Sequence, residues 1–215
     1  MSRPRETVYV WQLPVRVTHW LVALSIMMLS ITGIYIGYPY LHGGNSLMLV
    51  MKAVHLVSAI VLVCAVVWRI AWLFMGNAWS TWRAFVPFAT PGWWGRAWET
   101  VLFYSFLRRD SPEETGHNPL AATAYIGVYG LICIEIFTGF ALNANTWGGW
   151  WYTAFGWIFL LLPANDVRLV HHLAMWFLLG FVVHHIYSSV LMDAQERSGI
   201  LSSIATGYKF VRRKP

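Results

Sequence analysis

Charged side chains are scarce in this sequence. Only 11% of its 215 residues are Asp, Glu, Lys or Arg, whereas 58% are hydrophobic. Soluble domains are typically about a quarter charged. The composition therefore excludes an ordinary soluble globular protein and indicates an integral membrane protein.

Cysteine is also scarce, since Cys64 and Cys133 are the only two and both lie within apolar runs. This excludes a disulfide framework and a spaced-cysteine metal motif, and we expect both to pack in the core. The first residues, "MSRPRETVYVWQLPVRVTHW", lack a short apolar region followed by a small-residue cleavage site. A cleavable signal peptide is therefore not expected.

Four apolar stretches are long enough to cross a bilayer as helices, which takes about 20 residues. They are residues 15–36, 47–73, 120–142 and 168–191. We find no internal repeat or low-complexity linker. The sequence therefore predicts an all-α integral membrane four-helix bundle, with residues 1–215 forming one domain.

Two further stretches are apolar but too short to span. "WWYTAFGWIFLLLP" follows the third predicted span, and "PGWWGRAWETVLFYSFLRR" precedes it. Tryptophan favours the headgroup depth of a membrane. We expect both stretches to form short interfacial helices.

Basic residues are absent from the first and third connections, "GYPYLHGGNS" and "NANTWGGWWYTAFGWIFLLLPAND". They gather instead in the N-terminal segment, the middle connection and the C-terminal tail. The positive-inside rule then predicts both termini and the middle connection in the cytoplasm. The net charge of +6 thus reflects topology and anionic lipid, and without a nucleic-acid motif we expect no nucleic-acid partner.

The fourth predicted span, within "DVRLVHHLAMWFLLGFVVHHIYSSVLMD", contains four histidines. Imidazole is poorly suited to lipid, which cannot replace its water partners. His171 and His185 are fourteen residues apart, so they lie within about 40° of one helix face and roughly 21 Å apart along the axis. No other pair from opposite ends is so well aligned, which leaves His172 and His184 without a secured role.

Topology supplies each aligned histidine with a partner at the same depth. His19 lies near the cytoplasmic end of the first span and His55 near the outer end of the second. The sequence therefore predicts two pairs: His19 with His185, and His55 with His171.

Such pairs are what two stacked haem b groups require, each iron taking one axial imidazole from each of two helices. No C-x-x-C-H motif indicates covalent c-type haem. Zinc is disfavoured because the two pairs are a helix length apart and we expect no carboxylate or thiolate to complete either one. The alternative is that the histidines only hold helices together by hydrogen bonds.

Other residues are candidates for supporting such haems. Arg16, Lys52 and Arg168 each precede a proposed ligand by three residues, where a cation suits a haem propionate, although snorkelling basic residues need no haem. Glycines at 33, 127, 130, 139 and 180 leave clearance either for porphyrin faces or for close helix contacts. Glu135 is the only acid well inside a span; we expect it to be protonated, hydrogen-bonded, or placed against water or a cofactor, with no partner assigned.

Three segments carry a resemblance to a known family. "RVTHWLVALSIMMLSITG" and "RLVHHLAMWFLLGFVVHH" closely resemble two signatures of the b-type cytochrome subunit of membrane-bound nickel-iron hydrogenases, apart from Leu169, which replaces a small residue. "GHNPLAA" is similar to the start of that family's third span. The membrane subunit of respiratory formate dehydrogenase looks more distantly related.

The resemblance implies a bacterial-type cytoplasmic membrane protein that holds the small and large hydrogenase subunits at the outer face. Electrons would pass from the iron–sulfur small subunit through two haem b groups to a quinone near the cytoplasmic side, with no hydrogen-activating or catalytic residue in this chain. His117 and Asn118 are candidate quinone contacts, although Asn118 before Pro119 is also a favourable helix cap. The rival interpretations are a dihaem cytochrome serving formate dehydrogenase or another redox partner, a free-standing cytochrome of the b561 type, and a structural anchor or metal-binding transporter without haem.

Overall fold

The computed structural model describes residues 5–39, 44–86, 92–108 and 115–212. Contacts divide the chain into two compact units. The first unit comprises Met1–Tyr125 with His185–Pro215, and the second comprises Ile126–His184.

Four long helices confirm the predicted spans. They are α1 (Leu13–Gly37), α2 (Gly44–Met75), α4 (Pro119–Trp147) and α7 (Ala164–Glu196). All four are long and apolar enough to cross a membrane. Each extends beyond its predicted range at both ends, because backbone hydrogen bonding defines the ends of a helix and need not stop where an apolar stretch does. The all-α membrane class is therefore confirmed.

The short stretches are helical as well. α3 (Trp93–Tyr104) begins after Gly92, whose φ of 73° is left-handed. The stretch after the third span forms two helices, α5 (Gly149–Phe155) and α6 (Ile158–Leu161), rather than one. A 3-10 turn, Trp82–Ala84, follows α2, and α8 (Ile200–Thr206) follows α7.

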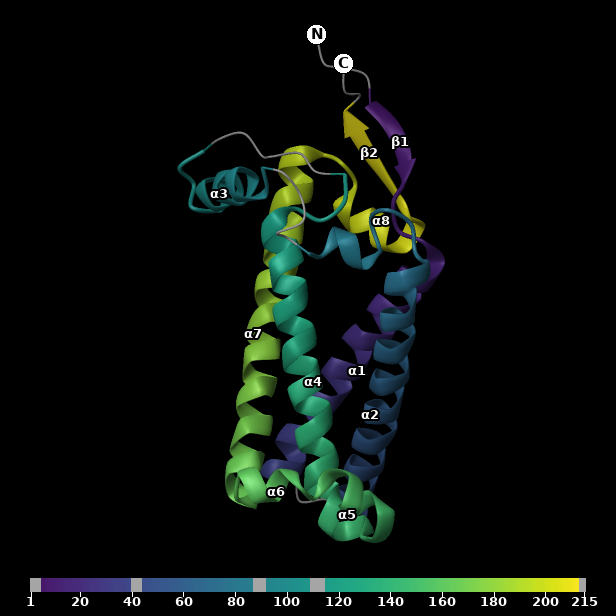
Figure 1. Cartoon of the computed structure of the whole chain (residues 1–215), viewed down its shortest axis with the longest axis vertical. Coiled ribbons are helices and arrows are strands. Elements are labelled where there is room, and N and C mark those ends of the chain that lie inside the picture. The colour runs from purple at the N-terminus through teal and green to yellow at the C-terminus, as the bar shows by residue number, and fades with distance from the viewer. Residues whose placement is uncertain (1–4, 40–43, 87–91, 109–114, 213–215) are drawn as a thin grey trace. The chain divides into compact units, whose positions relative to one another are not determined.

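Two strands in the first unit were not predicted. β1 (Arg5–Tyr9) pairs antiparallel with β2 (Tyr208–Arg212), so that Tyr9 lies opposite Tyr208 (Figure 1). The two tyrosine rings are 5.0 Å apart, and the indole N–H of Trp11 donates to Ser203 Oγ at 3.1 Å. These contacts join the two ends of the chain beside the start of α1.

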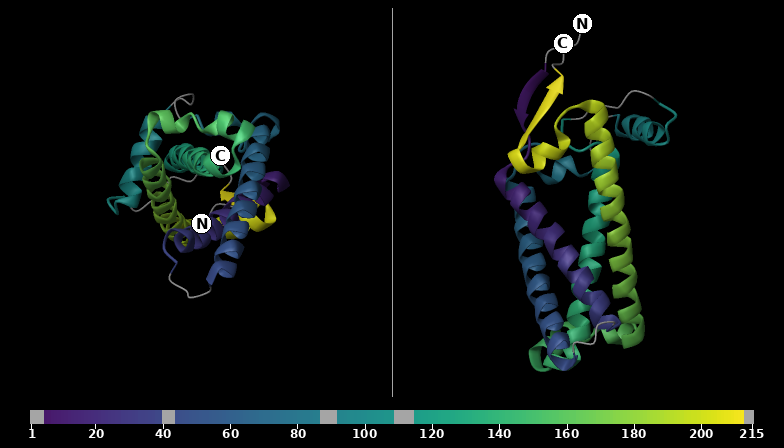
Figure 2. Two further views of the ribbon diagram at one scale, coloured as in Figure 1. Left: turned by 90° about the horizontal axis from the view of Figure 1, so that it is seen from below. Right: turned by 180° about the vertical axis from the view of Figure 1, so that it is seen from behind.

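Helices α1 and α2 pack side by side in the first unit (Figures 1 and 2). The side chain of Gln12, just before α1, connects the start of α1 to the end of α2. Its Oε1 accepts hydrogen bonds from Trp72 Nε1 at 3.0 Å and from the Asn77 backbone N–H at 2.9 Å. The contact fixes the relative heights of residues on α1 and α2.

Candidate functional site

His55 on α2 is held by a threonine of α1. Its Nδ1 lies 2.9 Å from Thr32 Oγ1, and Thr32 is buried. The Thr32 hydroxyl donates its own hydrogen to the carbonyl of Met28, at 2.7 Å, so towards the imidazole its oxygen can only accept. The proton of His55 therefore sits on Nδ1, which leaves Nε2 with a lone pair for a metal.

His171 on α7 has the same arrangement in the second unit. Its Nδ1 lies 2.8 Å from Thr138 Oγ1 of α4. The Thr138 hydroxyl donates to the carbonyl of Ile134, at 2.6 Å. By the same argument, His171 is protonated on Nδ1 and carries its lone pair on Nε2.

A glycine follows the threonine in both arrangements. A Cβ at Gly33 would lie 3.4 Å from His55 Cε1, and a Cβ at Gly139 would lie 3.3 Å from His171 Cε1. The distance at Gly139 is tighter than nine in ten real Cβ contacts, and the distance at Gly33 is at the lower limit of ordinary contact. The glycines thus let each imidazole lie against the backbone of the neighbouring helix.

A Thr-Gly pair is therefore used twice, on α1 and on α4. Gly33 and Gly139 were named as clearance residues from the sequence, but Thr32 and Thr138 were missed. The signal was present as the repeated dipeptide in "SITG" and "IFTG". The role of this dipeptide could not be inferred from the sequence, because the sequence does not show which helix faces each histidine.

Glu135 has the partner that could not be assigned from sequence. Its Oε2 lies 2.8 Å from His171 Nδ1, and its side chain is only 13% exposed. The other oxygen, Oε1, is buried and makes no hydrogen bond within the described residues. Of the expected situations for this acid, the structure shows the hydrogen-bonded one.

His19 and His185 meet within the first unit. Their ring centres are 6.2 Å apart with planes inclined at 52°, and His19 Nδ1 is buried without a hydrogen-bond partner in the described part of the chain. Metal to imidazole nitrogen bonds are about 2 Å long and a ring centre lies roughly 1.1 Å behind its nitrogen, so two imidazoles on one metal have centres about 6 Å apart. The spacing accommodates a shared metal.

Comparison with known proteins identifies the family. Residues 10–207 match the model of the prokaryotic cytochrome b561 family. The chain belongs to the prokaryotic cytochrome b561 family.

Several curated relatives share nearly the whole chain. A protein of Bradyrhizobium diazoefficiens is 37% identical over 97% of this chain and 88% of its own length. One from Rhizobium leguminosarum bv. viciae is 35% identical over 97% of this chain and 91% of its own. Both are described as a probable Ni/Fe-hydrogenase B-type cytochrome subunit.

A more divergent relative comes from Escherichia coli. It is 30% identical over 94% of this chain and 90% of its own length, and is described as a probable Ni/Fe-hydrogenase 1 B-type cytochrome subunit. The resemblance seen in the sequence is thereby confirmed. The family implies b-type haem and electron transfer, and with four apolar helices it makes this chain an inner-membrane protein.

The residues present fit a b-type haem. His55 and His171 carry their lone pairs on Nε2, the glycines at 33 and 139 leave room beside the rings, and His19 and His185 have the spacing of a shared iron. Imidazole is the axial ligand that b-type haem proteins use. The four histidines remain predicted ligands.

His172 and His184, the neighbours of the aligned pair, lie differently. His172 Nδ1 lies 2.7 Å from the carbonyl of Arg168 in its own helix. His184 is exposed, as is His185, but a ring contact with His19 is found for His185. The minor role predicted for His172 and His184 stays a prediction.

The three basic candidates differ in their surroundings. Arg16 Nη1 donates to the carbonyl of Ala205, and Arg168 Nη1 donates to Asn165 Oδ1 at 3.3 Å. Lys52 is exposed on α2. Their propionate roles stay predictions.

Asn118 caps α4, because its Oδ1 accepts the backbone N–H of Ala121 at 2.8 Å. The expected structural role of this residue is therefore confirmed. His117 packs between two aromatic rings, with centres 4.8 Å from that of Trp11 and 5.0 Å from that of Phe85. Its Nδ1 is buried and has no hydrogen-bond partner among the described residues.

His117 is neutral in this setting. Burial, and then the positive charge of Arg69, lower the pKa of His117 to about 3. Arg69 is only 3% exposed; it donates to the carbonyl of Ser80 at 3.2 Å and lies 5.3 Å from the Phe85 ring centre. Arg69 was missed from sequence, although an arginine near the end of a span is a signal for a buried polar contact.

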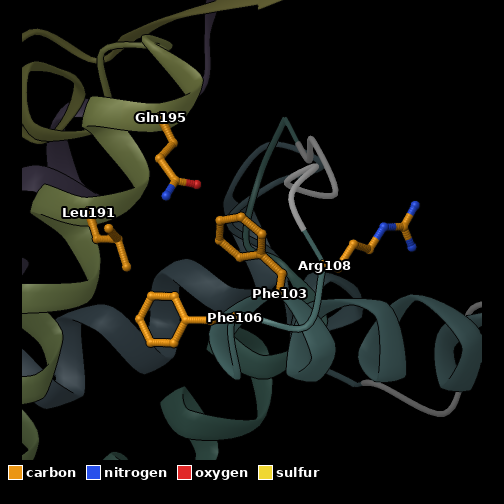
Figure 3. Close-up of a pocket in the computed structure, with 5 residues that line it drawn as sticks. All are labelled: Phe103, Phe106, Arg108, Leu191 and Gln195. Atoms are coloured by element: carbon orange, nitrogen blue, oxygen red, sulfur yellow. The ribbon is translucent and has the colours of Figure 1, made fainter.

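A cavity of about 420 Å³ lies between α3 and the last turns of α7 in the first unit (Figure 3). It is lined by Phe103, Phe106, Arg108, Leu191 and Gln195. Arg108 points away from the other four side chains in Figure 3 and pairs with Glu99 at 3.1 Å. None of the predicted site residues is among these five.

Proposed function

We propose that this chain is the dihaem b membrane subunit of a nickel-iron hydrogenase. In this role it anchors the small and large hydrogenase subunits and carries electrons from the iron–sulfur small subunit to a quinone. The observation that carries the haem assignment is the repeated arrangement in which a threonine hydroxyl lies within hydrogen-bond distance of the Nδ1 of a histidine. The hydrogenase assignment is supported by the descriptions of the relatives.

The proposed ligands form two pairs. His55 and His171 hold the outer haem, while His19 and His185 hold the inner one. When bound, the two haems supply one-electron transfer between the two faces of the membrane. Arg16, Lys52 and Arg168 bind propionates in this proposal.

The protein's own part is to orient the ligands. Thr32 and Thr138 set the imidazole tautomer, so that each Nε2 is ready to bind iron without first losing a proton. His117 and Asn118 lie at the start of α4, where we place the quinone contact. A neutral His117 can accept a hydrogen bond from a quinol or, as the other tautomer, donate to a quinone carbonyl.

The basic residues support an orientation with both termini and the middle connection in the cytoplasm. The hydrogenase then lies on the outer face, where electrons enter at the outer haem. Quinone is reduced near the cytoplasmic face, and membrane lipid surrounds the four spans.

Matched histidine variants of the purified, haem-replete hydrogenase complex test the proposal. His171→Ala is compared with His172→Ala, and His185→Ala with His184→Ala. The readouts are the reduced-minus-oxidised spectrum, haem per chain, and hydrogen-dependent reduction of a soluble quinone analogue.

We expect two b haems per chain in the parent complex and one after either His171→Ala or His185→Ala. The adjacent variants should keep two, because neighbouring residues on a helix point about 100° apart. Equal haem loss from all four variants would refute the ligand assignment. Absence of b-type bands from the parent would refute the haem function, and purification with a formate-oxidising partner instead would refute the hydrogenase assignment.

A further inference from the structure

The arrangement around His171 contains a carboxylate in addition to the threonine. Glu135 Oε2 and Thr138 Oγ1 both lie 2.8 Å from His171 Nδ1. Glu135 is three residues before its threonine, and the corresponding residue on α1, three before Thr32, is the apolar Leu29. The repeated Thr-Gly arrangement is thus modified by an acid on α4.

A carboxylate in a membrane span is costly unless it has a partner. The contact of Oε2 with His171 is the hydrogen bond that the Glu135 side chain makes within the described residues, while Oε1 is buried without one. The acid therefore points at the imidazole with one oxygen and leaves the other unused. The hydrogen bond of Glu135 is therefore directed at His171.

An ionised acceptor acts on an imidazole more strongly than a hydroxyl does. Charge-assisted hydrogen bonds are about twice as strong as neutral ones. A carboxylate that accepts the N–H of a metal-bound histidine fixes the ring orientation and raises the basicity of the other nitrogen. A more basic ligand stabilises the oxidised, more positive form of the iron.

We propose that Glu135 is a positioning residue for His171: its carboxylate accepts the Nδ1–H and lowers the midpoint potential of the haem that His171 holds. This inference rests on the proposed haem function. It assigns to Glu135 an effect on one haem only, so the other haem in the same protein serves as an internal reference.

The test is a redox titration of both haems in the purified complex, followed by optical spectra and by electron paramagnetic resonance. The variants are Glu135→Gln, which keeps the shape and replaces the carboxylate by an amide, and Glu135→Asp, which keeps a carboxylate. Shortening the side chain by one carbon withdraws its oxygens by roughly 1.5 Å. Aspartate therefore separates the hydrogen bond from the charge alone.

At the parent midpoint potential of the outer haem, we expect Glu135→Gln to raise the ratio of reduced to oxidised outer haem by about tenfold. For a one-electron couple this corresponds to an upward shift of about 59 mV. Glu135→Asp should move the potential in the same direction, and the inner haem should not change. Retention of the inner haem also reports that the variant is folded.

Three results would overturn the inference. An outer haem with the parent potential in Glu135→Gln would show that the contact does not act on the iron. A parent potential in Glu135→Asp would assign the effect to charge rather than to the hydrogen bond. If haem were lost while the remaining outer haem kept the parent midpoint potential, Glu135 would have only a structural role, as a contact between α4 and α7. Failure of the proposed function itself is distinguishable, because the parent complex would then lack b-type spectra.

Discussion

Replacing Thr32 by valine preserves the side-chain shape and removes the hydroxyl that faces His55. In the parent protein this hydroxyl accepts the Nδ1–H at 2.9 Å. In the variant a methyl group takes its place, so the N–H loses this acceptor. Valine at Thr138 should weaken haem binding less, because Glu135 Oε2 also lies 2.8 Å from His171 Nδ1 and can still accept its hydrogen.

The magnitudes follow from the cost of these losses. A buried donor left without its acceptor costs about 1–3 kcal/mol, whereas loss of one ordinary hydrogen bond costs about 0.5–1.5 kcal/mol. With about 1.4 kcal/mol for each factor of ten, we expect Thr32→Val to weaken outer-haem binding by about fivefold to a hundredfold. Thr138→Val should weaken it by about twofold to tenfold.

Haem transfer from the detergent-solubilised protein to excess apomyoglobin measures this effect optically. Thr32→Ser and Thr138→Ser are the matched controls, since serine keeps the hydroxyl, and both should remain close to the parent. Equal weakening by the two valine variants would show that Glu135 does not substitute for Thr138. Unchanged haem release from Thr32→Val would refute the assignment of the proton to His55 Nδ1.

Three further predictions concern other residues. A leucine at Gly139 must displace His171, because even a Cβ would lie 3.3 Å from Cε1, and haem analysis should show loss of the outer haem alone. Gly207→Ala combines a φ of +91° with a Cβ 2.5 Å from a Tyr9 ring carbon; it should lower the free energy of unfolding by about 2 kcal/mol or more and speed proteolysis of the paired terminal segments. Burial lowers the pKa of His117 from its ordinary 6.5 to about 3, so the unfolded state binds the extra proton between these values. Stability should therefore fall as the pH drops from about 6.5 towards 3, and thermal unfolding of His117→Gln should lack this part of the pH dependence.

Each of these predictions has a control and a contrary outcome. Gly139→Ala should act more weakly than leucine, and full haem content in the leucine variant would contradict the close contact. Gly44 also has a positive φ, but no atom of the described residues lies within 4 Å of a Cβ there. Gly44→Ala therefore measures the backbone strain alone, and an equal effect at Gly207 would exclude the clash. An unchanged pH dependence in His117→Gln would mean that another group binds the proton.

The spans and the family could be predicted because they depend on local properties of the chain. Hydrophobic length sets where a helix can cross a membrane, and the fixed helical turn aligns His171 with His185 whatever surrounds them. The Asn118–Pro119 pair likewise predicted the cap of α4 from adjacent residues alone. The strand pair was missed because β1 and β2 lie at opposite ends of the chain, and pairing over such a separation leaves no local pattern.

The sequence by itself determined the membrane class, the four spans, the family and the candidate histidines, since each follows from composition, period or motif. Only the tertiary structure decided which residues face those histidines. It placed Thr32 and Thr138 at Nδ1, and thereby set the tautomer through hydroxyls already committed to helix carbonyls. It also gave Glu135 a partner 36 residues away, at His171, because the contact depends on the packing of α4 against α7 and not on the residues adjacent to either side chain.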